Sequence, residues 1–306
     1  MNINKKNQMK NNKKTLNYKK KHNKLNRILV VSTMSSGKST LINALIGKEL
    51  FPSRNDACTS KVMRYISNNR LKHVKAIVKG EKEAKFNNIT KESLAEINSN
   101  QEYNSIMLTG PIKSIYKYNN SIEIIDTPGT NNSQDENHMN ITLDFLESGQ
   151  FDVILYILNA TQLGVNDDLV LLNKIKQYLD KNMQKKIVFV LNKMDQIDDE
   201  IESIEDIYNN AINYIKKIGI DEVKLVSISA ELAKLIKKDK YERLSKFEER
   251  KFKMYKSMFL ECNNSLYNYQ NLSENIGKVR FKDKTINKEL SMKSGLVVLE
   301  EYLANL

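Results

Sequence analysis

Short apolar runs alternate with stretches of helical periodicity along most of the chain. The runs predict strands near residues 28–32, 61–67, 73–79, 121–126, 151–158, 186–191 and 223–228. The periodic stretches predict helices near residues 38–47, 90–98, 137–149, 167–181, 202–218 and 294–304. This alternation predicts an α/β fold with a mostly parallel central sheet and helices on both faces. In such folds ligands bind outside the carboxyl ends of the strands.

Residues 231–293 break the alternation. Apolar positions between Leu232 and Phe259 predict long helix with dense charge between them, and the Asn-rich residues 262–290 predict a loop. Compact helical periodicity returns in the final stretch, "SGLVVLEEYL". The predicted parts are therefore a basic tail over residues 1–27, a core over 28–230, a basic, partly helical insertion over 231–293, and the closing helix of the core over 294–306.

The positive charge lies in two of these parts. The tail has ten Lys or Arg and no acidic residue, and the insertion has 16 basic and nine acidic residues. The core is slightly acidic, with 23 basic and 26 acidic residues. Basic segments of this kind often contact phosphate-rich lipid or nucleic acid. Solvated filler rich in Lys and Asn has the same composition, and both interpretations stay open.

The composition also bears on the compartment. The longest apolar run, residues 151–160, is too short for the ~20 residues that cross a membrane as a helix. The N-terminus has no apolar signal core, and the chain has only two cysteines. We therefore expect a cytoplasmic protein without disulfides.

The stretch "VVSTMSSGKSTLINALIG", residues 30–47, joins a predicted strand to a predicted helix. Gly37, Lys38 and Ser39 match the end of the phosphate-loop motif, while Ser32 stands where that motif has its first glycine. Lys38 would reach the β- and γ-phosphates, and the Ser39 hydroxyl would bind Mg²⁺. Amides at the helix N-terminus would face the phosphates. The predicted phosphate-binding set is Ser35, Ser36, Gly37, Lys38, Ser39 and Thr40.

A second strand end carries "IEIIDTPG". Asp126 ends the predicted strand and could hold a water bound to Mg²⁺. The amide of Gly129 would contact a γ-phosphate and lose that contact on hydrolysis. The same Asp-Thr-Pro-Gly letters also form a good turn, which is the structural alternative.

Two further strand ends predict a base site. In "IVFVLNKMD", which contains Asn192, the Asp195 carboxylate would accept from guanine N1–H and from the exocyclic amino group. Adenine offers neither donor, so such a carboxylate rejects it. The stem of Lys193 would lie over the purine, and the backbone of Ser229 and Ala230 in "VSISA" would contact the guanine carbonyl oxygen. The alternative is that Asn-Lys-Met-Asp caps the next helix.

The four motifs occur in the order, and at the strand ends, that a guanine nucleotide site requires. Their joint occurrence favours that site over the separate structural alternatives. The sequence therefore predicts a P-loop GTPase fold that binds GTP or GDP with Mg²⁺. Elsewhere, Asp167 and Asp168 are predicted to cap the helix over residues 168–181.

The set "MSSGKSTLINALIG", "ACTSK", "DTPG" and "NKMD" resembles the GTPase domain of bacterial dynamin-like proteins, within the dynamin superfamily. The resemblance covers residues 28–230 and the final "SGLVVLEEYL", but not the tail or most of residues 231–290. It implies that Thr59, 21 residues after Lys38, closes over the γ-phosphate, binds Mg²⁺ and orients the attacking water. It also implies that Ser35 helps to hold a monovalent cation, K⁺ or Na⁺, in place of an arginine finger.

The chain departs from the family pattern near the phosphates. Met34 stands where the family often has a polar residue, and a thioether cannot aim a water, so we expect slow hydrolysis by a single molecule. No Gln follows Gly129, which agrees with dynamin-like enzymes. The candidate catalytic residues are Ser35, Lys38, Thr59 and Gly129, and the candidate metal ligands are Ser39, Thr59 and Asp126.

The resemblance implies a dynamin-like GTPase that dimerises through its nucleotide face and acts at a membrane, peripheral to its inner face, and the basic segments make an anionic membrane the expected surface. The chain stops just after the predicted closing helix, so it is either a GTPase-domain fragment or relies on a second dynamin-like subunit for a helical stalk. Two alternatives stay open. One is a GTPase that acts on RNA, the ribosome or the chromosome, although no RNA-binding domain is recognisable and nucleic acid is the less favoured partner. The other is a GTP-binding scaffold with little hydrolysis, which Met34 favours.

Overall fold

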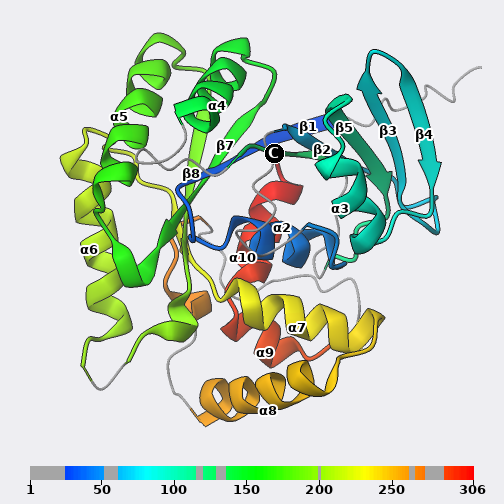
Figure 1. Cartoon of the computed structure of the whole chain (residues 1–306). Helices are drawn as coiled ribbons and strands as arrows, with labels where there is room; N and C mark the ends of the chain where they lie inside the picture. Colours follow the sequence, from blue (N-terminus) through cyan, green and yellow to red (C-terminus); the bar gives the residue numbers. More distant parts are fainter. Residues whose placement is uncertain are drawn as a thin grey trace, which may run out of the picture.

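Nine strands in the described part of the chain form one sheet at the centre of the computed structural model (Figure 1). The structure describes residues 25–51, 61–114, 120–128, 136–198, 201–261, 266–272 and 286–306. In sheet order the strands are β4 (Glu83–Asn87), β3 (Lys75–Gly80), β5 (Tyr103–Gly110), β2 (Met63–Ser67), β6 (Ser121–Asp126), β1 (Leu25–Ser32), β7 (Val153–Asn159), β8 (Lys186–Asn192) and β9 (Leu225–Ser227).

The half of the sheet that carries the candidate motifs is parallel. β6, β1, β7, β8 and β9 all run in one direction. β7 is buried along its whole length, as expected for a strand covered on both faces. Beyond β6 the directions mix, because β2 is antiparallel to β6 and β3 is antiparallel to both of its neighbours. The predicted α/β fold with a mostly parallel sheet is confirmed.

The apolar runs predict seven of these strands, and β4 and β5 are additional. β4 lies at the edge of the sheet and buries none of its side chains fully, and β5 has the exposed polar residues Asn104 and Ser105 directly after its first residue. β4 has no apolar run, and the run in β5 spans only Ile106–Leu108, shorter than the about 4–8 residues that predict a strand. β1 begins at Leu25, and the last three residues of the predicted tail therefore belong to the sheet.

Helices cover both faces of the sheet, with α4, α5 and α6 grouped on one side of the parallel strands and α2 and α10 on the other (Figure 1). In the part of the chain that the structure describes, none of them is both long and apolar enough to cross a membrane. The helices are α2 (Lys38–Ile46), α3 (Lys91–Ser99), α4 (Glu136–Ser148), α5 (Asn166–Lys181), α6 (Ile204–Lys217), α7 (Ala230–Tyr241), α8 (Lys246–Glu261), α9 (Lys288–Lys293) and α10 (Leu296–Ala304), with 3-10 turns at η2 (Ala160–Gln162), η3 (Met194–Gln196) and η4 (Leu266–Asn268).

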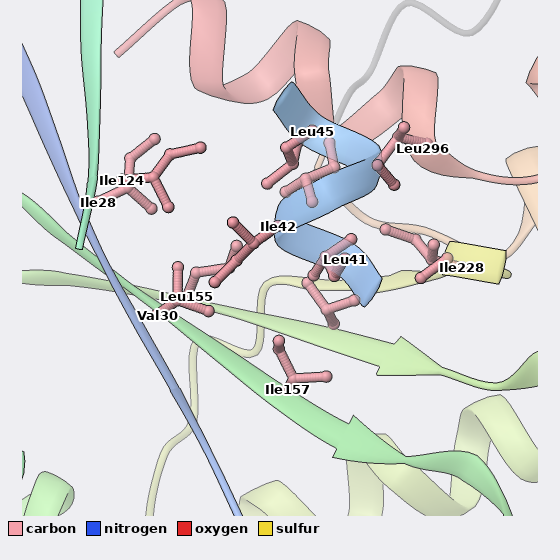
Figure 2. Packing of buried hydrophobic residues seen from close by; sticks show 14 of the residues in the cluster. Ile28, Val30, Leu41, Ile42, Leu45, Ile124, Leu155, Ile157, Ile228 and Leu296 are labelled. Atoms are coloured by element: carbon pink, nitrogen blue, oxygen red, sulfur yellow. The ribbon is translucent and has the colours of Figure 1, made fainter. Parts of the chain in front are cut away.

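The core forms where α2 packs on the sheet. Leu41, Ile42 and Leu45 make one apolar stripe along α2. Figure 2 shows this stripe among fully buried branched side chains, which include Ile28, Val30, Ile124, Leu155, Ile157, Ile228 and Leu296. Each such side chain contributes about 1.5–3 kcal/mol when it is fully buried, so the stripe holds α2 firmly against the sheet.

The C-terminal end of α2 is joined to two other helices by a buried ion pair. Lys237 of α7 lies with its Nζ 2.6 Å from Oε1 of Glu300 in α10, and the two side chains are 1% and 0% exposed. Lys237 also donates to the carbonyl oxygens of Ala44 and Leu45, the latter at 3.2 Å. Carbonyls in the last turn of a helix have no partner within the helix, and they attract a cation. The pair therefore fixes α7 and α10 against the end of α2.

The predicted long helix after residue 231 is two helices. α7 begins at Ala230, across the predicted boundary of the core, and residues 242–245 separate it from α8. α8 buries Phe252, Tyr255 and Phe259 and exposes Phe247. In the predicted loop, Gln270 forms an antiparallel bridge with Val226 of β9, so part of this segment lies along the sheet edge. The boundaries predicted between the tail, the core, the insertion and the closing helix remain a prediction.

Glu49 connects the helices around the end of α2. Its carboxylate accepts from Lys91 of α3 at 2.5 Å and from Lys238 of α7 at 2.6 Å. Lys238 also donates to Glu248 of α8 at 2.6 Å. Burial raises the pKa of Glu49, but the hydrogen bonds from Lys238 and Lys91 outweigh it and lower the pKa to about 2.

The Glu49 carboxylate should make folding sensitive to acid. Since its pKa is lower in the folded than in the unfolded chain, it stabilises the fold above about pH 4.5, and this stabilisation is lost as the pH falls toward about 2. We expect the free energy of unfolding in urea to fall more steeply between these pH values for the native protein than for Glu49→Gln. The exposed Glu96 of α3 provides the control, and Glu96→Gln should behave as the native protein does. Equal slopes for the native protein and Glu49→Gln would contradict this assignment.

Candidate nucleotide-binding site

The predicted phosphate loop is the connection between β1 and α2. Ser35 and Gly37 both adopt the left-handed conformation, with φ of 59° and 89°. A Cβ on Gly37 would lie 2.3 Å from Nδ2 of Asn192, so both the conformation and the space require glycine. A left-handed non-glycine residue costs about 1–3 kcal/mol, and such strain is concentrated at functional sites. α2 begins directly after the loop, at Lys38, so the unpaired amides of its first turn are available to an anion.

Ser32 does not disturb this loop. It ends β1 in register with Ile157 of β7 and is buried. The positive φ angles fall on Ser35 and Gly37 and not on Ser32. The backbone at Ser32, where the motif has its first glycine, therefore does not require a glycine in this protein.

A buried carboxylate holds the start of the loop. Asp168 of α5 accepts from the hydroxyls of Thr33 and Tyr156, each at 2.9 Å, and Ser36 Oγ donates to the carbonyl of Thr33 at 3.0 Å. Burial raises the pKa of Asp168, and the hydrogen bonds from Tyr156 and Thr33 oppose that effect. The predicted capping role of Asp167 and Asp168 is wrong, because Val165 is the N-cap of α5 and both residues lie inside its first turn, where Asp168 turns into the core.

Lys38 and Asp126 form the charged centre of the site. Asp126 ends β6 beside Val30 of β1, and Lys38 Nζ donates to its Oδ1. Both side chains are buried. Burial raises the pKa of Asp126, and the positive charge of Lys38 opposes this rise. The Lys38 ammonium is thereby held beside the predicted phosphate loop.

These residues fit Mg²⁺ as it binds beside a nucleotide. The Asp126 carboxylate and the hydroxyl of Ser39, in the first turn of α2, are hard oxygen donors. The described residues contain no cluster of three or more His, Cys, Asp or Glu, which would indicate an all-protein metal cage. Mg²⁺ in phosphate sites needs none, since waters and phosphate oxygens complete its octahedron.

Asn192 joins the phosphate loop to the predicted base site. From the end of β8 its Nδ2 donates to the carbonyl of Ser36 at 2.8 Å, and its Oδ1 accepts from the amide of Ala230 at 3.1 Å. Ser229 caps α7 by accepting from the amide of Leu232 at 3.2 Å. The two predicted base motifs therefore lie side by side at the edge where the parallel strands end.

Three of the remaining predicted site residues lie in the described part of the chain. Lys193 is left-handed, with φ of 66°, and Asp195 lies half-buried in η3, where its Oδ2 accepts from the hydroxyl of Tyr255 at 2.7 Å. Thr40 is half-buried in the first turn of α2. Thr59 and Gly129 lie outside the described residues.

Several residues of the site were not predicted from the sequence. Thr33 and Asp168 support the phosphate loop, and Tyr255 reaches Asp195 from α8. Gly295, with φ of 75°, is the N-cap of α10 and lies so close to the end of β9 that a Cβ there would be 2.0 Å from the carbonyl oxygen of Ser227. Only Gly295 had a local signal, a glycine directly before an apolar helical stretch.

Comparison with known proteins agrees with this geometry. The sequence model of a family described as "Dynamin family" matches residues 28–194. GTPase Era of Buchnera aphidicola subsp. Acyrthosiphon pisum (strain Tuc7) is 26% identical over 208 residues, which cover 66% of this chain and 52% of that protein. Bacterial dynamin-like protein of Nostoc punctiforme is 24% identical over 197 residues, 59% of this chain and 26% of that protein. The chain thus spans about half or less of the length of these relatives.

A solved structure shows the same fold. It belongs to an oligomerised bacterial dynamin pair, described as providing a mechanism for the long-range sensing and tethering of membranes. The match has a TM-score of 0.53 at 16% identity and covers 84% of this chain and 47% of that chain. Identity this low supports likeness of fold alone.

The Asn192 bridge should be measurable as stability. Asn192→Ala leaves two buried backbone groups without a partner, and each costs about 1–3 kcal/mol, so we expect a loss of about 2–6 kcal/mol in urea unfolding without nucleotide. The control is Asn159→Ala at the end of the adjacent β7, where the side chain bonds to Thr161 and Gln162 in the turn that follows it. A lost cap costs about 1 kcal/mol. Equal losses for the two variants would show that Asn192 does not bridge the loops.

Proposed function

Since the chain belongs to the dynamin family and carries a GTPase domain of that family, we propose that this protein binds GTP and GDP with Mg²⁺ and hydrolyses GTP. The observation that carries the proposal is the bridge from Ser36 through Asn192 to Ala230. Its two hydrogen bonds join the loop after β1 to the loop after β9 at the carboxyl ends of parallel strands, which supports the proposal because nucleotides bind such folds there.

The phosphate half would work through charge. Lys38, held by Asp126 in the structure, would exchange this partner for the β- and γ-phosphates. Ser39, Thr59 and Asp126 would hold Mg²⁺, which neutralises charge on the phosphate oxygens. The amides of residues 35–40 would donate to the phosphates, and the Gly129 amide would contact the γ-phosphate.

The base half would select guanine. The Asp195 carboxylate would accept from guanine N1–H and from the exocyclic amino group, and the Lys193 stem would cover the purine face. The backbone of Ser229 and Ala230 would contact the guanine carbonyl oxygen. Adenine would leave the carboxylate without a donor, which a binding site penalises strongly.

Hydrolysis would need a second copy of the domain. Met34 cannot aim a water, and Thr59 would orient it only once its segment closes. Ser35 is exposed at the tip of the loop, where it would help to hold K⁺ or Na⁺ against a facing copy. A self-complementary interface of this kind has two-fold symmetry.

The setting we propose is the cytoplasm and the inner face of a membrane. The basic tail would attract anionic lipid, and a second dynamin-like subunit would supply a helical stalk. A second candidate is action on RNA, the ribosome or the chromosome, which the same basic charge favours. A GTP-binding scaffold with little hydrolysis is the third, favoured by Met34.

Nucleotide binding tests the base assignment. We expect GDP to bind at least about 100-fold more tightly than ADP, because Asp195 has no donor to accept from on adenine. Asp195→Asn should weaken GDP and favour xanthosine diphosphate, since an amide group can donate where the carboxylate only accepts. Asp198→Asn, at an exposed Asp three residues on, is the matched control and should keep the preference for GDP. Similar affinities for GDP and ADP would remove the base assignment.

Turnover tests the dimer and the membrane. GTP turnover per molecule should rise with protein concentration, fall when K⁺ and Na⁺ are replaced by a bulky cation, and disappear in Thr59→Ala while GDP still binds. Anionic liposomes should sediment the full chain but not a variant that lacks residues 1–24, which keeps β1 whole. Brisk turnover that ignores protein concentration and cation would contradict the dimer, and binding without any turnover would favour the scaffold. Sedimentation with DNA or RNA alone would favour the second candidate.

A further inference from the structure

The insertion helix α8 reaches the proposed base site through one hydroxyl. Tyr255 lies on the buried face of α8 and is 4% exposed. Its hydroxyl donates to Oδ2 of Asp195, 2.7 Å away and 60 residues earlier in the chain. Asp195 is the residue to which the proposed function assigns the recognition of guanine, so a segment outside the four nucleotide motifs contacts the selecting carboxylate.

A second contact, one turn earlier on α8, holds the other side of the base site. Lys251 Nζ lies 3.0 Å from Oε1 of Glu231, which directly follows Ala230 in the first turn of α7. Lys251 also lies 5.7 Å from the ring centre of Tyr255, and the ring of Phe259 packs edge-on at 6.3 Å. The Tyr255 ring therefore has a neighbour on each side along the helix. Through Tyr255 and Lys251, α8 is tied to Asp195 in η3 and to Glu231 in α7.

The chemistry of the carboxylate leaves room for guanine. An ionised Asp has about four acceptor positions on its two oxygens, and guanine would use one on each. The bond from Tyr255 takes a third. The second torsion of an Asp side chain is broad and roughly two-fold, so an exposed carboxylate turns freely about it. A fixed donor on one oxygen sets the plane in which both oxygens meet the ligand.

Tyr255 remains a donor over the whole physiological range. Burial raises its pKa, and the negative charge of Asp195 raises it further. The hydroxyl is thus neutral, and it does not act as a pH switch.

We propose that Tyr255 is a positioning residue for base selection: through its hydroxyl, α8 holds the Asp195 carboxylate in the plane that accepts two hydrogen bonds from guanine. This inference rests on the proposed function of the site. It makes α8 part of the base site and not only a cover over α7.

Inosine diphosphate separates positioning from mere packing. Its base has the N1–H of guanine but no exocyclic amino group, so it would donate a single hydrogen bond to Asp195. Loss of the fixed plane should weaken a two-bond ligand more than a one-bond ligand. In Tyr255→Phe we therefore expect GDP to bind about 10-fold more weakly, which is the order of one hydrogen bond to a charged group. The affinity for inosine diphosphate should fall by less. The ratio of the GDP affinity to the inosine diphosphate affinity should therefore be smaller than in the native protein.

The experiment measures GDP, inosine diphosphate and ADP binding to the full chain by calorimetry. Tyr208→Phe removes a phenol hydroxyl from α6, where the ring packs against Tyr269, and should leave both affinities as in the native protein. Phe252→Leu loosens the buried face of α8 and should lower the melting temperature while the ratio of GDP to inosine diphosphate stays unchanged. The melting temperature of Tyr255→Phe should be close to that of Tyr208→Phe.

Three results would overturn the inference. Tyr255→Phe could bind both nucleotides as the native protein does, lose affinity for both by the same factor, or bind GDP more tightly because the hydroxyl competes with the base. Each of these results counts against the inference when the native protein prefers GDP over ADP. If it has no such preference, the proposed function itself fails, and the two failures are thereby distinguished.

Discussion

The side-chain amide of Asn192 connects the two halves of the candidate site, and the geometry of both depends on it. It is buried at the end of β8, donates to the carbonyl of Ser36 and accepts from the amide of Ala230. Without it, both backbone groups would be buried and unpaired, which folded proteins avoid. Its Nδ2 also lies where a side chain at position 37 would be. Gly37 and Asn192 therefore determine each other, and a distant strand end keeps the phosphate loop in its left-handed turns.

Around this contact, α2 is held at both of its ends. Asp168 accepts from Thr33 at the start of the loop, and Lys237 caps the last carbonyls of α2 while it pairs with Glu300. A buried ion pair alone often costs more in desolvation than it returns, but here the cation also satisfies carbonyls that would otherwise have no partner. The phosphate-loop helix, α7 and α10 are consequently fixed in one relative position.

The helices after the core form a continuous path to the base motifs. Lys293 of α9 donates to the carbonyl of Phe259 in α8 at 2.6 Å, and the amide of Ser229 donates to the carbonyl of Ser294 at 3.0 Å. Gly295 then brings α10 into contact with Ser227. These contacts tie the start of α10 to the backbone of Ser227 and Ser229, the segment that carries the second predicted base motif.

The sequence by itself determined the α/β class, seven strands of the sheet, and the nucleotide motifs, because burial on both faces and helix starts leave local patterns in the chain. Gly37 and Lys38 could be assigned to the phosphate-loop motif from the neighbouring residues alone. The tertiary structure decided the rest. Asp168 had the pattern of a solvated helix start, yet it is buried under Thr33, and nothing near Tyr255 indicated that it meets Asp195. These contacts join residues 60 or more positions apart. Periodicity reports which face of a local element is buried, but only packing decides which distant group that face meets.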